Sequence, residues 1–293
     1  AASVRTATRR AYVEAILAQY EKREEEMAQA ISMEMGAPID MSRSDQAPCL
    51  PWHLKNFLTA FDHIDWVRPL GPHAPNDRIA LEPIGVVGLI TPWNWPLNQI
   101  CAKVAPALAA GCSMIVKPPE EAPGTAVLVL QCFIDAGLPA SVASMVFGVP
   151  DTVSRHLIAS PVIRKISFTG SVPVGKHLMR LAADGAKRTT MELGGHGPVI
   201  VWDDCDIEKT VTIVSAFKWR NAGQVCVSPT RLIVHEAIAD RFAAAMSQRA
   251  KGLTVGPGLD AATQMGPLAN PRRPLAMESL IGDALNQGAT LLA

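Results

Sequence analysis

The sequence is poor in aromatic residues and carries no net charge. Phe, Trp and Tyr make up 5% of its 293 residues, and 27 Lys and Arg balance 27 Asp and Glu. A neutral chain argues against a nucleic-acid-binding protein, which needs a surplus of basic residues to neutralise phosphates. Hydrophobic residues still form 48% of the chain, enough to fill a core and to exclude an intrinsically disordered protein. The length allows about two domains.

No apolar run approaches the roughly 18 residues that a membrane-spanning helix needs. The most apolar region, residues 84–116, is interrupted by Pro92, Asn94, Pro96, Lys103 and Pro106. The N-terminus runs into a charge-rich amphipathic segment and lacks the apolar core of a secretory signal. We therefore expect a soluble cytoplasmic protein with neither a membrane nor a nucleic acid as partner.

Patterns for metal binding and for disulfides are also missing. The six cysteines form no Cys-x-x-Cys pair, and the seven histidines form no His-x-x-x-His pair. In a chain of this length the cysteines do not suggest a disulfide framework, and no metal site is predicted. Most of the cysteines are expected to be small buried hydrophobic residues.

Helical periodicity dominates the first part of the chain. Apolar residues recur at helical spacing over 7–35, where Gly36 and Pro38 provide a stop, and another helix is expected over 45–62. Residues 66–83 are rich in proline and turn residues, which predicts a loop and a hairpin.

From residue 84 onward, short apolar runs alternate with helical patterns. Strands are expected at 84–90, 113–116, 143–147, 164–168, 189–193 and 198–202, and helices at 95–110, 122–136, 151–159 and 172–184. Apolar strands that are each followed by a helix predict a doubly wound parallel α/β sheet, Rossmann-like and covered on both faces. We predict a nucleotide-binding domain over 1–194. A second α/β domain follows over 195–293, with helices near 206–221 and 236–250 around a strand at 230–235.

Two strand ends could contact a nucleotide. Residues 170–176 nearly match the phosphate-binding loop of nucleoside triphosphatases, but His177 replaces the Ser or Thr that would ligate magnesium. A glycine turn at a helix N-terminus can still hold a phosphate, although a plain strand-to-helix turn would look the same. Lys117 and Glu120 end another apolar run, where they could hydrogen-bond a ribose or form a solvated loop pair.

Three further residues carry reactive groups. Asn94 lies in the rigid loop Thr91–Pro96 and could donate its amide to an oxyanion or merely cap the next helix. Glu192 lies in a largely apolar strand before a glycine turn, which suits a general base or a buried ion pair with Lys187 or Arg188. Cys226 follows a glycine-containing turn and could be a nucleophilic thiolate or a structural cysteine.

Individually these signals are weak, but their order and spacing are specific. The motifs TPWNWP, VKPPE, FTGS, MELGG and NAGQVC resemble the NAD(P)-dependent aldehyde dehydrogenase superfamily, and the similarity runs from the first helix to the last residue. The segments around MELGG and NAGQVC resemble the succinate-semialdehyde dehydrogenase branch. The resemblance implies a Rossmann-like domain followed by an α/β catalytic domain that is incomplete here, because chains of this family are considerably longer.

The resemblance also implies roles for individual residues. Cys226 would be the nucleophile and Glu192 the general base, Asn94 would donate to the oxyanion, and Lys103 would belong to a proton relay. Contacts with the cofactor are implied for Trp93, Lys117, Glu120, Gly148, Gly170, Ser171, Gly175 and Leu193. NAD is expected in preference to NADP, since the Glu120 carboxylate would accept a ribose 2′-hydroxyl and repel a 2′-phosphate.

The implied reaction is oxidation of an aldehyde to a carboxylic acid through a thiohemiacetal and a thioester on the cysteine. The complete protein is expected to form a homodimer or homotetramer, partly through the 66–83 hairpin. Because the later part of the family's catalytic domain is absent, we expect the isolated 293-residue chain to be poorly active or inactive. Two alternatives are a non-catalytic remnant that binds nucleotide or pairs with a complete subunit, and a thiol esterase that needs no cofactor.

Overall fold

The computed structural model describes residues 6–293, and these form two compact units. Unit 1 contains residues 6–28 and 43–193, and unit 2 contains residues 29–42 and 194–293. The sequence had suggested a continuous first domain over 1–194, whereas residues 29–42 group with the C-terminal part of the chain. The cause is a set of long-range backbone contacts, which the periodicity of one segment cannot reveal.

A five-stranded parallel sheet forms the centre of unit 1. Its strands are β3 (Val86–Ile90), β4 (Met114–Lys117), β5 (Ala143–Met145), β6 (Ile163–Gly170) and β7 (Arg188–Leu193). They are ordered β5-β4-β3-β6-β7, and every neighbouring pair is parallel. The chain first builds outward from β3 to β5 and then returns to place β6 on the other side of β3. This confirms the doubly wound sheet and puts its topological switch point between β3 and β6.

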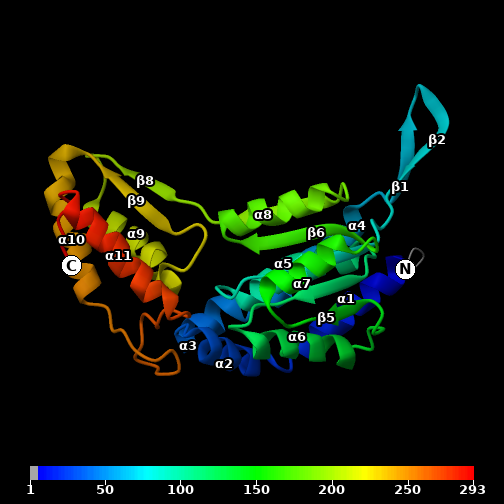
Figure 1. Ribbon diagram of the computed structural model, residues 1–293, viewed down its shortest axis with the longest axis horizontal. Coiled ribbons are helices and arrows are strands. Elements are labelled where there is room, and N and C mark those ends of the chain that lie inside the picture. Colours follow the sequence, from blue (N-terminus) through cyan, green and yellow to red (C-terminus); the bar gives the residue numbers. More distant parts are fainter. Residues whose placement is uncertain (1–5) are drawn as a thin grey trace. The chain divides into compact units, whose positions relative to one another are not determined.

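Helices cover both faces of this sheet (Figure 1). Two of them, α5 (Pro96–Ala109) and α6 (Pro123–Asp135), contact β3, β4 and β5, while α7 (Pro150–Ala159) and α8 (Val172–Ala183) contact β3, β6 and β7. An outer layer of α1 (Thr6–Tyr20) and α4 (Cys49–His63) packs on α5.

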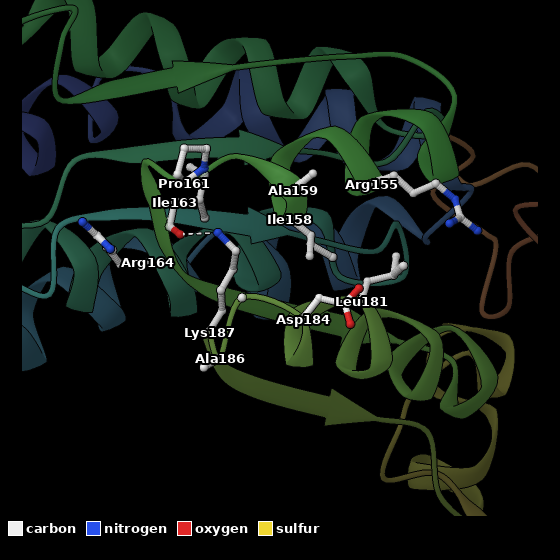
Figure 2. Close-up of a pocket in the computed structure, with 11 residues that line it drawn as sticks. Arg155, Ile158, Ala159, Pro161, Ile163, Arg164, Leu181, Asp184, Ala186 and Lys187 are labelled. Atoms are coloured by element: carbon white, nitrogen blue, oxygen red, sulfur yellow. Dashed lines mark hydrogen bonds between the residues drawn. The ribbon is translucent and has the colours of Figure 1, made fainter.

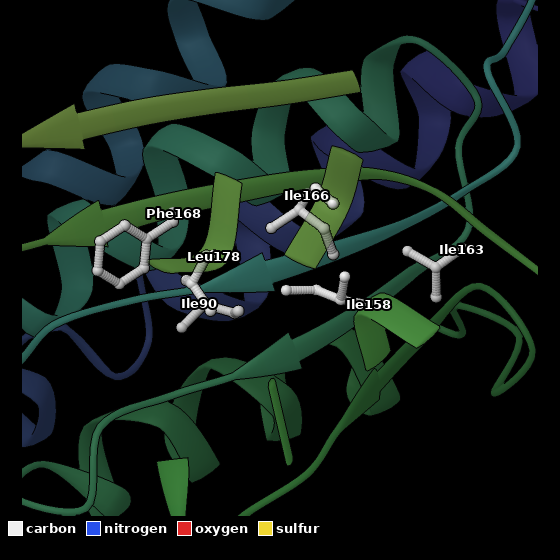
Figure 3. Packing of buried hydrophobic residues seen from close by; sticks show 7 residues of the cluster. Ile90, Ile158, Ile163, Ile166, Phe168 and Leu178 are labelled. Atoms are coloured by element: carbon white, nitrogen blue, oxygen red, sulfur yellow. The ribbon is translucent and has the colours of Figure 1, made fainter. Parts of the chain in front are cut away.

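The core beneath α7 and α8 shows which residues of β6 face which side. Ile166 and Phe168 pack with Ile158 of α7 and Leu178 of α8 (Figure 3). Because successive side chains of a strand point to opposite faces, Ser167, between these two, points to the other face, toward α5.

Two predictions for the N-terminal region had different outcomes. The helical pattern over 7–35 is two helices, α1 and α2 (Glu24–Met35), interrupted at residues 21–23, where neither glycine nor proline marks the break. A short α3 (Ile39–Met41) and a π-helical turn, Ser42–Gln46, precede α4. The hairpin predicted within 66–83 is confirmed as β1 (Val67–Gly71) and β2 (Ala74–Ala80), which pair antiparallel and project from the rest of unit 1 (Figure 1).

Unit 2 is built on a parallel pair, β8 (Gly197–Val201) and β9 (Pro229–Val234). They are joined through α9 (Ile207–Trp219) and a 3₁₀ turn, Arg220–Gly223, and β9 leads through a second turn into α10 (Ala239–Lys251). The predicted strand and helices of this region are therefore present, while α11 (Arg272–Asn286), which has no buried residue, was not anticipated. Between residues 6 and 293, no helix combines the length and apolarity that crossing a bilayer requires.

Residues 36–39 are attached to the remainder of unit 2 by close backbone packing. Gly36 ends α2 with a left-handed φ of 79°, and the Ile39 N–H donates to the Gly258 carbonyl at 2.8 Å. A Cβ atom at Gly258 or at Gly266 would collide with the Gly36 carbonyl oxygen. Only glycine therefore allows these backbones to approach.

Candidate active site

In unit 1 the predicted residues lie along the edge of the sheet that is formed by the carboxyl ends of its strands. Asn94 follows β3, Lys117 ends β4, Gly148 follows β5, Gly170 ends β6 and Leu193 ends β7. The carboxyl ends of parallel strands lie along a common edge, which is where doubly wound sheets bind their ligands.

Lys117 and Glu120 form an ion pair at the end of β4. The Lys117 side chain is 3% exposed, whereas the Glu120 side chain is 46% exposed, and Lys117 Nζ contacts Glu120 Oε1. A lysine this deeply buried is not part of a solvated loop pair, so that alternative is wrong. The arrangement leaves Glu120 partly open to solvent, where it can accept a hydrogen bond.

The turn from β6 into α8 offers backbone donors. Ser171 is the N-cap of α8, but its side chain makes no capping hydrogen bond. Pro173 has no N–H, but the first-turn N–H groups of Val172 and Val174 lack intrahelical partners and remain available to an anion. A Cβ added to Gly175 would lie 2.5 Å from Leu193 Cδ2, so this glycine allows the first turn of α8 to pack closely on β7.

Asn94 and Trp93 lie in the loop between β3 and α5, and both are half-buried. The N-cap position of α5 belongs to Trp95. Asn94 is therefore not the cap residue of that helix, which removes the capping alternative for its amide.

Glu192 is exposed, in contrast to the apolar setting expected from the sequence. It lies on the edge strand β7, whose residues alternate between exposed and half-buried. Lys187 does not pair with it, because its Nζ donates to the carbonyls of Ser160 and Ile163 at 2.6 Å each. The buried ion pair considered for Glu192 is absent from the described part of the chain, and its carboxylate faces solvent.

Lys103, on α5, is a second buried lysine of unit 1 in addition to Lys117. Its side chain is 6% exposed, and Nζ donates to Ser167 Oγ at 3.2 Å. Burial lowers the pKa of Lys103 from 10.5 to about 8, while the Glu192 carboxylate opposes the change and Lys165 adds to it. Ser167 was missed in the sequence, although Lys165, Ser167 and Thr169 are polar residues that alternate with Ile166 and Phe168, a pattern that could have revealed a polar side of β6.

The lowered pKa makes stability depend on pH. Above the unfolded-state pKa of 10.5 the amine is neutral in both states, and below about pH 8 charging the buried amine opposes folding. We expect the free energy of unfolding to rise by about 3 kcal/mol between pH 8 and 10.5 on account of this group. In Lys103→Met that contribution should be missing, as measured by urea unfolding at several pH values. Lys176→Met, at an exposed lysine, is the control and should show the same increase in unfolding free energy with pH as the wild type. If Lys103→Met also shows this increase, the pH dependence does not come from Lys103.

Unit 2 contains Cys226, the one exposed cysteine among the six. Three successive residues ahead of it, Asn221, Ala222 and Gly223, have left-handed φ angles of 55°, 54° and 73°. Gln224 secures the turn, since its Oε1 accepts from Ala269 N at 3.1 Å and its Nε2 donates to Asn221 O at 3.0 Å. Strained backbone of this kind persists where the surroundings hold it, often at functional sites.

A cavity of about 550 Å³ lies elsewhere in unit 1 (Figure 2). It opens between the C-terminal ends of α7 and α8, near the amino ends of β6 and β7, and Lys187 reaches across it to the Ile163 carbonyl. None of the predicted site residues lines it. The cavity is therefore separate from the residues expected to bind the cofactor.

Comparison with known proteins agrees with the motifs. The family described as "Aldehyde dehydrogenase family" matches residues 1–293. A putative 4-(hydroxymethyl)benzenesulfonate dehydrogenase from Comamonas testosteroni is 40% identical over 274 residues, which is 92% of this chain and 56% of the relative. The NADP⁺ succinate-semialdehyde dehydrogenase GabD of Escherichia coli is 36% identical over 280 residues, again 92% and 56% of the two chains.

Solved structures share the fold. A mutant of aldehyde dehydrogenase C from Pseudomonas syringae, crystallised with NAD⁺ and octanal, superposes with a TM-score of 0.95 at 37% identity. The match covers 99% of this chain and 59% of that one. The present chain thus spans little more than half the length of the curated relatives it matches.

Proposed function

Since this chain belongs to the aldehyde dehydrogenase family, we propose that it serves the NAD(P)-dependent oxidation of an aldehyde to a carboxylic acid. The observation that carries the proposal is the family match over all 293 residues. The exposed Cys226 and the line of polar residues along one sheet edge support it.

The chemical roles that we propose are those that the family resemblance implies for these residues. The Cys226 thiolate adds to the aldehyde carbon, and the Asn94 amide and the Cys226 N–H donate to the oxyanion that forms. After oxidation a thioester remains on Cys226. Glu192 takes a proton from water, the hydroxide attacks the thioester, and the acid leaves.

The sheet edge of unit 1 has features suited to a dinucleotide. Thr91 and Thr169, at the switch point, are 5% and 8% exposed, and in residues 6–293 their hydroxyls have no hydrogen-bond partner. Together with the open first turn of α8 and with Glu120, they offer donors and acceptors for phosphate and ribose. When bound there, NAD(P)⁺ would accept a hydride. We propose NAD rather than NADP on account of Glu120.

The relatives suggest the substrate class. One is named for succinate semialdehyde and another for a benzenesulfonate, and both names describe compounds with an anionic group remote from the reacting carbon. We propose an aldehyde of this kind. We also propose assembly into a homodimer or homotetramer through the β1–β2 hairpin, which light scattering of the purified chain would test.

NADH formation by the purified chain tests the proposed function. Succinate semialdehyde, a sulfonated benzaldehyde and short neutral aldehydes should be compared with NAD⁺ and with NADP⁺. Turnover that is fastest with an anionic aldehyde and NAD⁺ is the expected result. A folded chain that oxidises none of the aldehydes would overturn the proposal for this chain.

Glu192→Gln should separate the two halves of the reaction. Without the carboxylate, water is deprotonated slowly, so the steady-state rate should fall about a hundredfold while the first turnover changes little. Stopped-flow measurement should show a burst of NADH followed by a slow phase. The exposed Glu236→Gln is the control and should leave both phases unchanged. Equal slowing of burst and steady state would show that Glu192 is not the base for hydrolysis.

A further inference from the structure

Lys103 is held in unit 1 by a single side-chain hydroxyl. The lysine is 6% exposed and Ser167 is 8% exposed, and the distance from Nζ to Oγ is 3.2 Å. Within residues 6–293 no second hydrogen-bond or ion-pair partner of the amine is present. Ser167 is therefore the group that determines where this amine lies.

A hydroxyl suits an amine that gains and loses a proton. Ser167 Oγ can accept a hydrogen bond from the ammonium, and its O–H can donate to the lone pair of the neutral amine. A carbonyl could only accept, and a carboxylate would favour the charged form. The contact with Ser167 is therefore available in both protonation states of Lys103.

Backbone register relates Ser167 to Glu192. Ser167 and Thr169 are alternate residues of β6 and point to the same face, opposite to the face on which Ile166 and Phe168 pack. Thr169 is paired with Glu192 of the neighbouring β7, and paired residues carry their side chains on one face about 5 Å apart. The buried Thr169 hydroxyl has no partner among the residues described. It is thus placed between Ser167 and Glu192.

We propose that Ser167 is a positioning residue for the proposed aldehyde oxidation: its hydroxyl holds the Lys103 amine at the inner end of a row that passes Thr169 and ends at Glu192. In the hydrolytic step an O–H bond of water breaks, and the hydroxide adds to the thioester carbon. The proton goes first to the Glu192 carboxylate and then, along the relay that the family resemblance already implies for Lys103, to the neutral amine that Ser167 holds in place. Glu192 is thereby restored as a base, and the ammonium later releases the proton to solvent.

The charges around Lys103 fit a proton acceptor. Burial and Lys165 favour the neutral amine, and the Glu192 carboxylate favours the ammonium. With a pKa of about 8, a neutral fraction of the amine exists near neutral pH. The proposal rests on the proposed function for its chemistry, but the effect of Ser167 on the pKa of Lys103 can be measured without turnover.

An NMR titration of lysine-labelled protein tests that hold, with Lys103→Met to identify the signal. Ser167→Ala removes a hydrogen bond that is stronger to the ammonium than to the neutral amine, so the proton-dissociation constant of Lys103 should rise several-fold, up to about tenfold. Ser167→Thr retains a hydroxyl and should stay within about twofold of the wild type. Ser215→Ala, which removes another buried serine hydroxyl in unit 2, should change nothing. An unchanged titration in Ser167→Ala, or equal changes in the alanine and threonine variants, would overturn the proposal.

Kinetics supply the second arm of the test. Ser167→Ala should lower kcat about tenfold with KM unchanged and move the pH profile of the steady-state rate, whereas Ser167→Thr should restore both. A loss of kcat that the threonine variant does not restore would show a structural effect and contradict the proposal. If the wild-type chain forms no NADH at all, the proposed function fails on that result, and the Lys103 titration still decides whether Ser167 positions the amine.

Discussion

Replacement of Cys226 by alanine is expected to reduce aldehyde-dependent NADH formation by at least about a thousandfold. The thiolate forms the bond to the substrate, and removing the nucleophile of a covalent mechanism leaves only the weak catalysis of binding and oxyanion donors. Hydrolysis of an activated ester without cofactor should be lost as well, because it would use the same sulfur. Both activities can be followed by absorbance in one preparation.

Cys205→Ala is the matched control, since Cys205 is a partly buried cysteine of the same unit that packs beside the Val201 and Phe242 cluster. It should leave the specific activities close to those of the wild type. If ester hydrolysis survives in Cys226→Ala while NADH formation disappears, the esterase activity belongs to another group. If both survive, Cys226 is not the nucleophile.

Gly266→Ala should destabilise unit 2 by about 4 kcal/mol or more. The added Cβ would collide with the Gly36 carbonyl oxygen, and a collision with backbone cannot be relieved by turning a side chain. The φ angle of Gly266 is not in the left-handed region, so the destabilisation would come from the steric collision alone and not from backbone strain. Native-state hydrogen exchange of the β8 and β9 amides would assign the loss to unit 2.

Gly282→Ala provides the comparison within the same unit. Gly282 lies inside α11 with nothing within 4 Å of the position that a Cβ would take. Alanine is the better helix former, so this variant should gain up to about 1 kcal/mol. Wild-type stability in Gly266→Ala would mean that residues 36–39 do not pack against the 258–266 segment in solution.

The strands and helices of the sheet in unit 1 were predictable because each carries a local signal. The apolar runs that became β3, β4 and β6 are short and are followed by helical patterns, and this alternation admits few topologies. The break between α1 and α2 was not predictable, since residues 21–23 contain no helix breaker. The grouping of residues 29–42 with unit 2 depends on contacts more than 200 positions away along the chain, and no local pattern encodes it.

The candidate site followed from motifs more than from physical reasoning about single residues. Lys117 could be placed at a strand end from the sequence, but its burial against Glu120 could not. Glu192 was expected in apolar surroundings because Met191 and Leu193 flank it, whereas alternation on an edge strand leaves it exposed. The alternation of Lys165, Ser167 and Thr169 could have marked a polar face of β6. The sequence could not show that Lys103 of α5 donates a hydrogen bond to Ser167.

The discontinuity of unit 2 has a consequence for the order of events during synthesis. Residues 29–42 leave the ribosome before most of unit 1 is made, yet their partners include the carbonyl of Gly258. Unit 1 can close once residue 193 has emerged, but unit 2 must keep its early segment unpaired until the chain has grown past residue 266. Closing so long a loop raises the contact order and slows folding. The completion of unit 2 therefore depends on a segment that is synthesised before most of unit 1.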